Sequence, residues 1–412
     1  MKNTTTTPTG HTPTLLASFL HFDLSFMLWV LLGALGIYIT ESLGLSPSQK
    51  GLMVAIPILS GSLLRVPLGL LSDRLGGKRV GVGMLLFLFL PLALGWQTGK
   101  DLPSLIAVGL MLGTAGASFA VALPLASRWY PAGRQGLVMG IAAAGNSGTV
   151  IANLLAPRLA DKVGWHNVLG LAMLPLAVVL VAFLWLAKDS PGSVQAHPAS
   201  HYLNALKHSD MWWFCLFYSI TFGGYVGLSS FLPLFLRDQY GVSPVTAGYL
   251  TAMFAFVGSL VRPLGGYLAD RLGGVRLLSV LLFGIGVIYG LSASSPILGF
   301  MVFLLLAIMA CLGLGNGAVF QLVPQRFRQQ IGIATGVIGA VGGLGGFFLP
   351  ILLGSLKQWG GSFGFGFGVL ALLAFIALIV LRALTGVQEG WRFSWRVLQS
   401  EVLSPKSEVE VA

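Results

Sequence analysis

Two arginines stand inside otherwise uncharged apolar segments of this 412-residue chain, and each belongs to a copy of one short sequence. Gly61-Ser-Leu-Leu-Arg65 returns as Gly258-Ser-Leu-Val-Arg262, and 262 − 65 puts the two arginines 197 positions apart. A cation at bilayer depth costs roughly 2.5 to 3.5 kcal/mol on insertion scales, so such residues usually face a cavity or a charged partner. Neither segment has a carboxylate within two helical turns of its arginine. The pair therefore predicts a binding site for an anionic substrate.

The composition indicates a protein that crosses the membrane many times. Hydrophobic residues make up 55% of the chain and charged residues 9%, with a mean hydropathy of +0.85, which excludes a soluble globular protein. Each helical span needs about 20 apolar residues. We expect an all-α fold with twelve spans, near residues 20–42, 50–72, 80–98, 103–126, 134–157, 166–187, 211–236, 243–267, 277–294, 296–322, 330–355 and 362–384.

The longest polar interruption divides these spans into two sets of six. It contains His197, His201 and His208, which could bind a metal ion but which we interpret as part of a solvated cytoplasmic linker. The predicted parts are a disordered N-terminal tail, a six-helix bundle, the linker, a second six-helix bundle and a cytoplasmic tail, at residues 1–13, 14–187, 188–210, 211–385 and 386–412.

The basic residues predict the orientation in the membrane. Of the 24 Lys and Arg, two are the arginines within spans, 16 fall on the side of the N-terminus and 6 fall on the opposite side. The positive-inside rule then places both termini in the cytoplasm and the protein in the cytoplasmic (inner) membrane. Although the net charge is +11, it is distributed between spans rather than gathered in a patch, so we expect no nucleic-acid partner.

Glycine is concentrated in two of the expected spans, the fifth and the eleventh. Residues without a side chain let helix backbones approach closely and allow bending beside a cavity. We interpret the two clusters as hinges or as segments that face the site. They consist of Gly145, Gly148, Gly342, Gly343, Gly345 and Gly346.

The two copies continue beyond the arginines into a charged loop. Asp73-Arg74-Leu-Gly is matched by Asp270-Arg271-Leu-Gly in the same register. This loop resembles the conserved loop motif of the major facilitator superfamily, which implies a fold of two six-helix bundles that rock around a central site. We predict that these four residues form a conformational latch; alternatively, they are solvated and only set the topology.

The glycine clusters carry a closer resemblance. Ala-Gly145-Asn146-Ser-Gly148 and the Gly339 to Pro350 segment are similar to the two signature segments of the nitrate/nitrite porter family. That family also has one arginine in span two and one in span eight. The resemblance covers essentially the whole chain and implies a secondary transporter in which Arg65 and Arg262 clamp the anion.

The same resemblance implies four further contacts to the substrate. Asn146 would donate from its side-chain amide and Tyr218 from its hydroxyl, while Phe222 and Phe119 would form flat apolar walls. Nitrate is a planar anion without a proton to donate near neutral pH, so its recognition depends on donors in the protein. A guanidinium is planar and always charged, and it presents paired N–H groups to an oxyanion.

Few residues could couple transport to protons. Asp23 and His21, near the cytoplasmic start of the first span, are the candidates, although Asp23 could instead be an interfacial cap. Proton-linked nitrate uptake is our first expectation, with nitrate/nitrite exchange as the alternative. We predict no cofactor and no metal, because Cys215 and Cys311 lie in apolar spans without metal-binding spacing. We expect the protein to act as a monomer.

Other functions fit the sequence less well. An exchanger of organic anions or phosphate esters could use an arginine pair, but it should have a larger cavity with additional Lys or His. A drug-efflux carrier would gain nothing from two unpaired arginines. An anion sensor that does not transport should have a signalling domain, and the cytoplasmic segments are short. The chain has no grouping of nucleophile, base and acid, so we predict a transporter and not an enzyme.

Overall fold

The computed structural model describes residues 10–131, 144–190, 206–327 and 331–394, together with Val138 and Ala142. All secondary structure in this part of the chain is helical. The first half contains α1 (Thr12–Trp29), α2 (Leu31–Ala34), α3 (Gly36–Leu43), α4 (Pro47–Leu75), α5 (Gly77–Thr98), α6 (Leu102–Leu112), η1 (Gly113–Ser118), α7 (Phe119–Ser127), η2 (Ala144–Ser147), α9 (Gly148–Val163), α10 (Trp165–Leu171) and α11 (Met173–Leu186). The second half contains α13 (Ser209–Tyr218), η3 (Ser219–Gly223), α14 (Gly224–Tyr240), α15 (Pro244–Leu260), α16 (Arg262–Leu272), α17 (Gly274–Ala293), α18 (Leu298–Arg326), α19 (Ile331–Gly360), α20 (Gly364–Val387) and α21 (Glu389–Phe393).

Ten helical stretches among the described residues are long and apolar enough to cross a membrane. They confirm the prediction of an all-α protein with many spans. The other two expected spans are less regular. The one near residues 20–42 corresponds to α1, α2 and α3, which are separated by single residues, and part of the one near 134–157 lies outside the described residues.

The sequence explains where several of these helices begin and end. Ser46 caps α4 in a capping box with Gln49, and Asp101 caps α6 by accepting from the Ser104 backbone N–H. The chain turns sharply at Gly76, between α4 and α5, with a φ of 92°, and at Gly273, between α16 and α17, with a φ of 88°. These glycines are 273 − 76 = 197 positions apart, so both copies of the charged loop use a backbone conformation that other residues rarely adopt.

Three spans change helix type in their interior. In η1 and η2 the chain forms the tighter 3₁₀-helix, and in η3 it forms the wider π-helix. Such segments interrupt the regular hydrogen-bond pattern and are often found at functional sites.

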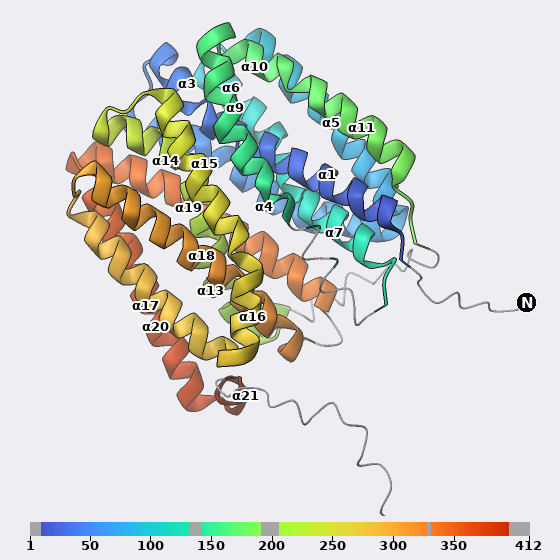
Figure 1. Ribbon diagram of the computed structural model, residues 1–412, viewed down its shortest axis with the longest axis vertical. Helices are drawn as coiled ribbons and strands as arrows, with labels where there is room; N and C mark the ends of the chain where they lie inside the picture. Colours follow the sequence, from blue (N-terminus) through green and yellow to red (C-terminus); the bar gives the residue numbers. More distant parts are fainter. Residues whose placement is uncertain are drawn as a thin grey trace, which may run out of the picture.

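The two halves meet along α4 and α19. Figure 1 shows α1, α5 and α11 on one side of the molecule and α17, α18 and α20 on the other, and α4 and α19 pack closely along each other between them. Gly51 of α4 lies against the Pro350 carbonyl of α19, and Gly354 of α19 lies against the Pro47 carbonyl of α4. Because a Cβ at either glycine would overlap that carbonyl oxygen, the glycines permit the close approach.

The N-terminal tail is shorter than predicted. Helix α1 already begins at Thr12, because the His11 side chain caps it by accepting from the Thr14 backbone N–H at 3.1 Å. The Gly10 N–H also donates to the Trp129 carbonyl at 2.8 Å. Residues 10–13 are therefore part of the folded unit.

The end of the chain also differs from the prediction. Helix α20 continues to Val387, and the short helix α21 packs back on the second half instead of belonging to a tail that starts at residue 386. Trp391 of α21 is fully buried, and its indole N–H donates to Asp210 at 2.9 Å. An aromatic side chain supplies a large apolar surface for such docking.

Candidate functional site

Arg65 lies in the middle of α4 and only 1% of its surface is exposed. Its Nε donates to the Gly116 carbonyl of η1 at 3.0 Å, and its Nη1 donates to the Gly339 carbonyl of α19. The Nη2 atom is buried and has no hydrogen-bond partner among the described residues. The first half of the molecule thus supplies the arginine, and carbonyl groups of both halves bind it. The N–H groups of Nη2 remain available as donors.

Three aromatic rings surround the Arg65 guanidinium. Its Cζ lies 5.4 Å from the centre of a ring of Trp29, 5.3 Å from that of Phe119 and 5.1 Å from that of Phe222. A guanidinium over aromatic faces gains cation–π attraction, which is largest where water is excluded. The rings therefore stabilise the cation without neutralising its charge.

Arg262 is the first residue of α16 and is separated from the end of α15 by Val261 alone. Its Nη2 donates to the Tyr218 hydroxyl at 3.3 Å, and its Cζ lies 5.7 Å from the centre of the Phe320 ring. Its Nη1 is buried without a partner in the described part of the chain. Each arginine therefore keeps at least one buried guanidinium nitrogen without a partner among the described residues.

Tyr218 and Phe222 connect the two arginines. Their rings stack in parallel with centres 4.9 Å apart and an interplanar angle of 2°. Arg262 binds the hydroxyl of Tyr218, while Arg65 lies over the ring of Phe222. The two cations, 197 positions apart in the sequence, thus lie at one aromatic-lined site.

The helix type of η3 and the glycines of α19 create this arrangement. Tyr218 ends α13 and Phe222 lies within the π-helix, so the stacked pair spans the transition between helix types. A Cβ at Gly342 would overlap the Tyr218 ring, and one at Gly345 would lie 2.5 Å from the Ser219 carbonyl oxygen. The glycine cluster of α19 therefore allows that helix to pack directly on the aromatic pair.

Phe320 of α18 is a site residue that the sequence analysis missed. Its ring packs edge-on against Tyr218 at 4.8 Å and lies 6.2 Å from Phe119 and 5.7 Å from Arg262. The chain has 26 Phe, and the only sequence signal near Phe320 is the glycine-rich run from Gly313 to Gly317. Trp29 also belongs to the site, and no sequence pattern distinguishes it from the other tryptophans of the chain.

Asn146 lies in η2 and is 3% exposed. Its side-chain oxygen is buried without a partner among the described residues. The glycines on either side pack against α1, since a Cβ at Gly145 would lie 2.8 Å from the backbone nitrogen of Asp23 and one at Gly148 would overlap the Asp23 carbonyl. These glycines thus bring η2 against α1.

Residues 17–350 of the chain match the family described as the Major Facilitator Superfamily. The chain belongs to this superfamily. It is 37% identical over 357 residues to the nitrite extrusion protein of Bacillus subtilis (strain 168), covering 86% of this chain and 90% of that protein. It is 35% identical over 397 residues to the probable nitrate/nitrite antiporter NarK1 of Thermus thermophilus, covering 88% and 89%.

A third relative supports the same assignment. The probable nitrate transporter NarT of Staphylococcus epidermidis is 33% identical over 358 residues, covering 86% of this chain and 92% of the relative. The predicted membership of the nitrate/nitrite porter family is confirmed. The protein is a multi-pass membrane transporter and not an enzyme.

The two proton-coupling candidates of this porter face different neighbours. Asp23 accepts a hydrogen bond from the Ser147 hydroxyl of η2 at 2.5 Å. His21 is fully buried, with its Nδ1 2.7 Å from the Ser118 hydroxyl and its Nε2 3.2 Å from the Gly81 carbonyl. Asp23 thus borders the segment that carries Asn146, whereas neither nitrogen of His21 contacts an arginine directly.

Among the described residues, the loop aspartates of the porter bind groups on neighbouring segments. Asp73 forms an ion pair with Arg128, beyond the end of α7. Asp270 accepts from the Gln321 amide of α18 at 2.8 Å. Arg74 is exposed, and Arg271 lies over the Tyr267 ring at 4.5 Å. A latch between helix ends would thus use Asp73 with Arg128 and Asp270 with Gln321.

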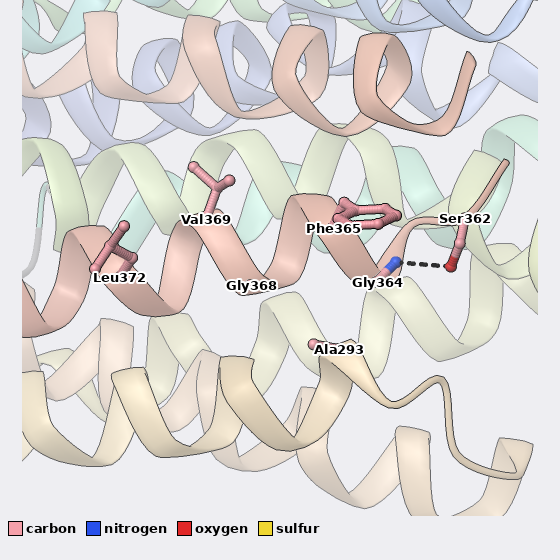
Figure 2. A pocket seen from close by; sticks show the side chains of 7 residues that line it. All are labelled: Ala293, Ser362, Gly364, Phe365, Gly368, Val369 and Leu372. Carbon is pink, nitrogen blue, oxygen red and sulfur yellow. Dashed lines mark hydrogen bonds between the residues drawn. The ribbon is translucent and has the colours of Figure 1, made fainter. Parts of the chain in front are cut away.

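An open groove lies elsewhere on the porter, where the start of α20 passes the end of α17 (Figure 2). Its volume is about 500 Å³. None of its lining residues is charged, so it offers no means of selecting an anion, and it shares no residue with the arginine site. The lining residues are Ala293, Ser362, Gly364, Phe365, Gly368, Val369 and Leu372.

Proposed function

We propose that this porter carries nitrate and nitrite, with one anion bound between Arg65 and Arg262 and released by alternating access. The observation that carries the proposal is the pair of guanidinium groups at one site, each with a buried nitrogen that lacks a partner among the described residues. An anion with three coplanar oxygens can accept from both forks at once.

The surroundings of the arginines suit a small, weakly hydrated anion. The Tyr218 hydroxyl accepts from Arg262, which leaves its own proton available for the anion. Phe119 and Phe222 present apolar faces that exclude water. The attraction between an anion and the arginines is stronger where water is excluded, because the effective dielectric constant is lower. The closely packed rings leave less room for a phosphate ester, which favours nitrate and nitrite over an organic anion. Asn146 completes the proposed donor set.

Electrostatics explains why substrate binding should close the carrier. Two unit charges about 8 Å apart at an effective dielectric constant of about 20 repel by roughly 2 kcal/mol. An anion between them replaces this repulsion with two attractions. The loaded carrier should therefore bring its halves together more readily than the empty one, so the substrate itself shifts the conformational equilibrium.

We propose proton-linked nitrate uptake as the mode of coupling, with Asp23 as the titrating group. Its carboxylate bonds to Ser147, the residue next to Asn146, so a change in its charge would be felt beside the proposed donor. His21 bonds to Ser118 and Gly81, neither of which is a proposed donor to the anion.

Exchange of nitrate for nitrite is a second candidate, and one observation favours it. Neither site arginine belongs to any of the four ion pairs found among the described residues. Without a carboxylate to replace the anion, the empty site keeps its repulsion, and return of the empty carrier is slow. The name of the Thermus thermophilus relative, an antiporter, agrees with this mode.

We further propose that a single chain suffices, because both arginines come from one polypeptide. Both termini would lie in the cytoplasm, since 16 of the 22 basic residues outside the spans fall on that side.

Uptake of labelled nitrate into proteoliposomes tests the proposal. Stimulation by an inward proton gradient alone would establish symport, and uptake only in the presence of internal nitrite would establish exchange. Liposomes that contain an Arg65→Ala, Arg262→Ala double variant are the control. The absence of nitrate uptake under both conditions, together with exchange of phosphate esters, would overturn the proposal.

A further inference from the structure

We infer that His21 is a positioning residue for Arg65, which it orients through the 3₁₀-helix η1. This inference rests on the proposed function and assigns to His21 a role different from the proton coupling predicted from the sequence. It links a residue of α1 to the proposed anion site through Ser118, without direct contact between His21 and the anion.

His21 joins three elements of the first half. Its Nε2 faces the Gly81 carbonyl of α5 at 3.2 Å, and a carbonyl oxygen only accepts, so Nε2 carries the proton. Because the ring is fully buried and no carboxylate of the described residues bonds to it, we assign it as neutral, so that Nδ1 accepts from the Ser118 hydroxyl at 2.7 Å. The imidazole also packs against the Phe183 ring of α11, with centres 4.9 Å apart. The neutral ring thus satisfies both of its nitrogens and fixes Ser118.

The segment that His21 fixes is the segment that holds Arg65. Ser118 is the last residue of η1. Two residues earlier, the Gly116 carbonyl accepts from Nε of Arg65 at 3.0 Å. One residue later, the Phe119 ring lies 5.3 Å from the guanidinium. Two of the contacts that orient the guanidinium therefore come from residues within two positions of Ser118.

The composition of η1 makes this tether important. Its sequence, Gly-Thr-Ala-Gly-Ala-Ser, contains only small side chains, and the Ser118–His21 contact is the only hydrogen bond made by these side chains within the described part of the chain. A 3₁₀-helix also has poorer hydrogen-bond geometry than an α-helix. Gly116 itself lies directly against the Trp29 ring, so the segment cannot move inward. Without the bond to His21, we expect η1 to move away from Arg65.

The surroundings of His21 do not suit a proton-coupling group. The groups that face it from α5, η1 and α11 are a carbonyl, a hydroxyl and a phenyl ring, none of which titrates. The nearest carboxylate along the chain, Asp23, bonds to Ser147 instead.

Three variants of the full-length protein test the inference. His21→Leu removes the acceptor of the hydrogen bond, and Ser118→Ala removes its donor. His21→Asn places an amide near the position of Nδ1, where its oxygen can accept from Ser118. We expect the first two to raise the Kd for nitrate about tenfold, which is the effect of losing roughly one hydrogen bond. The double variant should be no weaker than either single one, because both act on one contact. His21→Asn should restore most of the affinity.

The Kd is obtained from the rise of the unfolding temperature of the purified protein with increasing nitrate concentration. KM and kcat are measured in proteoliposomes. A purely structural role would lower the unfolding temperature without nitrate and leave Kd and KM unchanged, which would overturn the inference. The inference would also be overturned if His21→Asn bound nitrate with a normal Kd but its uptake lost the stimulation by a proton gradient that the unaltered protein shows. That result would assign proton coupling to His21. If His21→Leu fails to fold, Ser118→Ala decides alone.

His166→Leu is the matched control, because this histidine also bonds a carbonyl, that of Gly99 at 3.2 Å, at the opposite end of the spans. It should leave the nitrate Kd unchanged. Failure of the unaltered protein to bind nitrate would instead refute the proposed function, and the inference with it.

Discussion

Arg65 and Arg262 occupy equivalent positions of the repeated sequence, yet the fold holds them differently. Arg65 is fixed by two carbonyl groups and three aromatic rings. Arg262 is held by one hydroxyl and one ring. Since every additional contact restricts rotamers, Arg262 retains more freedom to follow the anion as the carrier changes shape. We therefore expect Arg65 to hold the anion in a fixed position and Arg262 to move with the anion during the transport cycle.

Replacing either arginine by lysine should abolish most nitrate uptake. Arg65→Lys and Arg262→Lys keep the charge but lose the planar fork, so the anion would be held by a point charge without control of its orientation. Uptake into proteoliposomes is the measurement, with membrane insertion checked by yield and by size-exclusion profile. Arg79→Lys, at an exposed arginine in the first turn of α5, is the control. Full uptake by both site variants would remove the arginine clamp from the mechanism.

Tyr218→Phe tests the hydroxyl separately from the ring. The variant keeps the stack on Phe222 but removes the acceptor of the Arg262 bond and the proton offered to the anion. A hydrogen bond to a charged group contributes about 1.5 to 3 kcal/mol, so KM for nitrate should rise roughly 10- to 100-fold. Tyr240→Phe is the matched control. Tyr240 is the last residue of α14, and its hydroxyl donates to the Pro296 carbonyl. An unchanged KM in Tyr218→Phe would mean that only the ring matters.

Among the elements, the first helices of the two halves repeat an aromatic pattern with different chemistry. Phe22, Phe26 and Trp29 precede Tyr218, Phe222 and Tyr225 by the same interval, 218 − 22 = 222 − 26 = 225 − 29 = 196. Both leading pairs are in ring contact, at 4.7 Å in the first half and 4.9 Å in the second. Only the second pair contains a hydroxyl that binds an arginine. The repeat therefore supplies the architecture of the site, and the departures from it supply the chemistry.

Two glycines of α19 should respond differently to alanine. A Cβ at Gly342 would overlap the Tyr218 ring, whereas a Cβ at Gly336 would meet nothing within 4 Å. Overpacking of this kind typically destabilises by about 1 to 3 kcal/mol. We expect Gly342→Ala to lower the unfolding temperature and to reduce nitrate uptake. Gly336→Ala should leave both unchanged or stabilise the helix slightly. Equal behaviour of the two variants would contradict the packing argument.

In the molecule as a whole, the ion pairs that join the two halves among the described residues lie at one end of the bundle. Lys50 pairs with Asp238 at 2.8 Å, and Glu41 pairs with Arg237 at 2.8 Å, beside the loops that lead into α4 and α15. Each pair joins the first half to the second. The ion pairs found at the other end, Asp73 with Arg128 and Asp210 with Arg326, stay within one half. This conformation thus keeps the halves together at the end that we place outside the cell.

Weakening an ion pair between the halves should favour the conformation that is open at that end. Lys50→Glu would put two like charges together at Asp238. A partly exposed pair contributes about 0 to 1 kcal/mol, so we expect a shift of a few-fold, which the swapped double variant Lys50→Glu, Asp238→Lys should reverse. Reaction of Ser48→Cys with an impermeant maleimide reports the opening. Labelling at the same rate in all backgrounds would exclude this pair from the closure.

Several features of the porter follow from local composition alone. Span length, positive-inside charge and the 197-residue repeat are properties of short segments, and they predict an all-helical transporter with arginines at its centre. The family assignment likewise follows from the glycine segments, whose residues are close together in the chain. The predicted ends of the folded unit are wrong at residues 10–13 and 386–393, because a helix cap and one buried tryptophan decide them.

Which side chains meet at the site depends instead on tertiary packing. Phe320 and Trp29 join the site through contacts with residues distant in sequence, and no local pattern separates them from the other aromatics. His21 lies two residues from Asp23, yet they face different helices. The π-helix and the 3₁₀-helices interrupt the regular hydrogen-bond pattern at segments that pack against neighbouring helices, and no local sequence preference predicts them. Packing between segments, rather than the preference of any one segment, fixes the geometry of the proposed anion site.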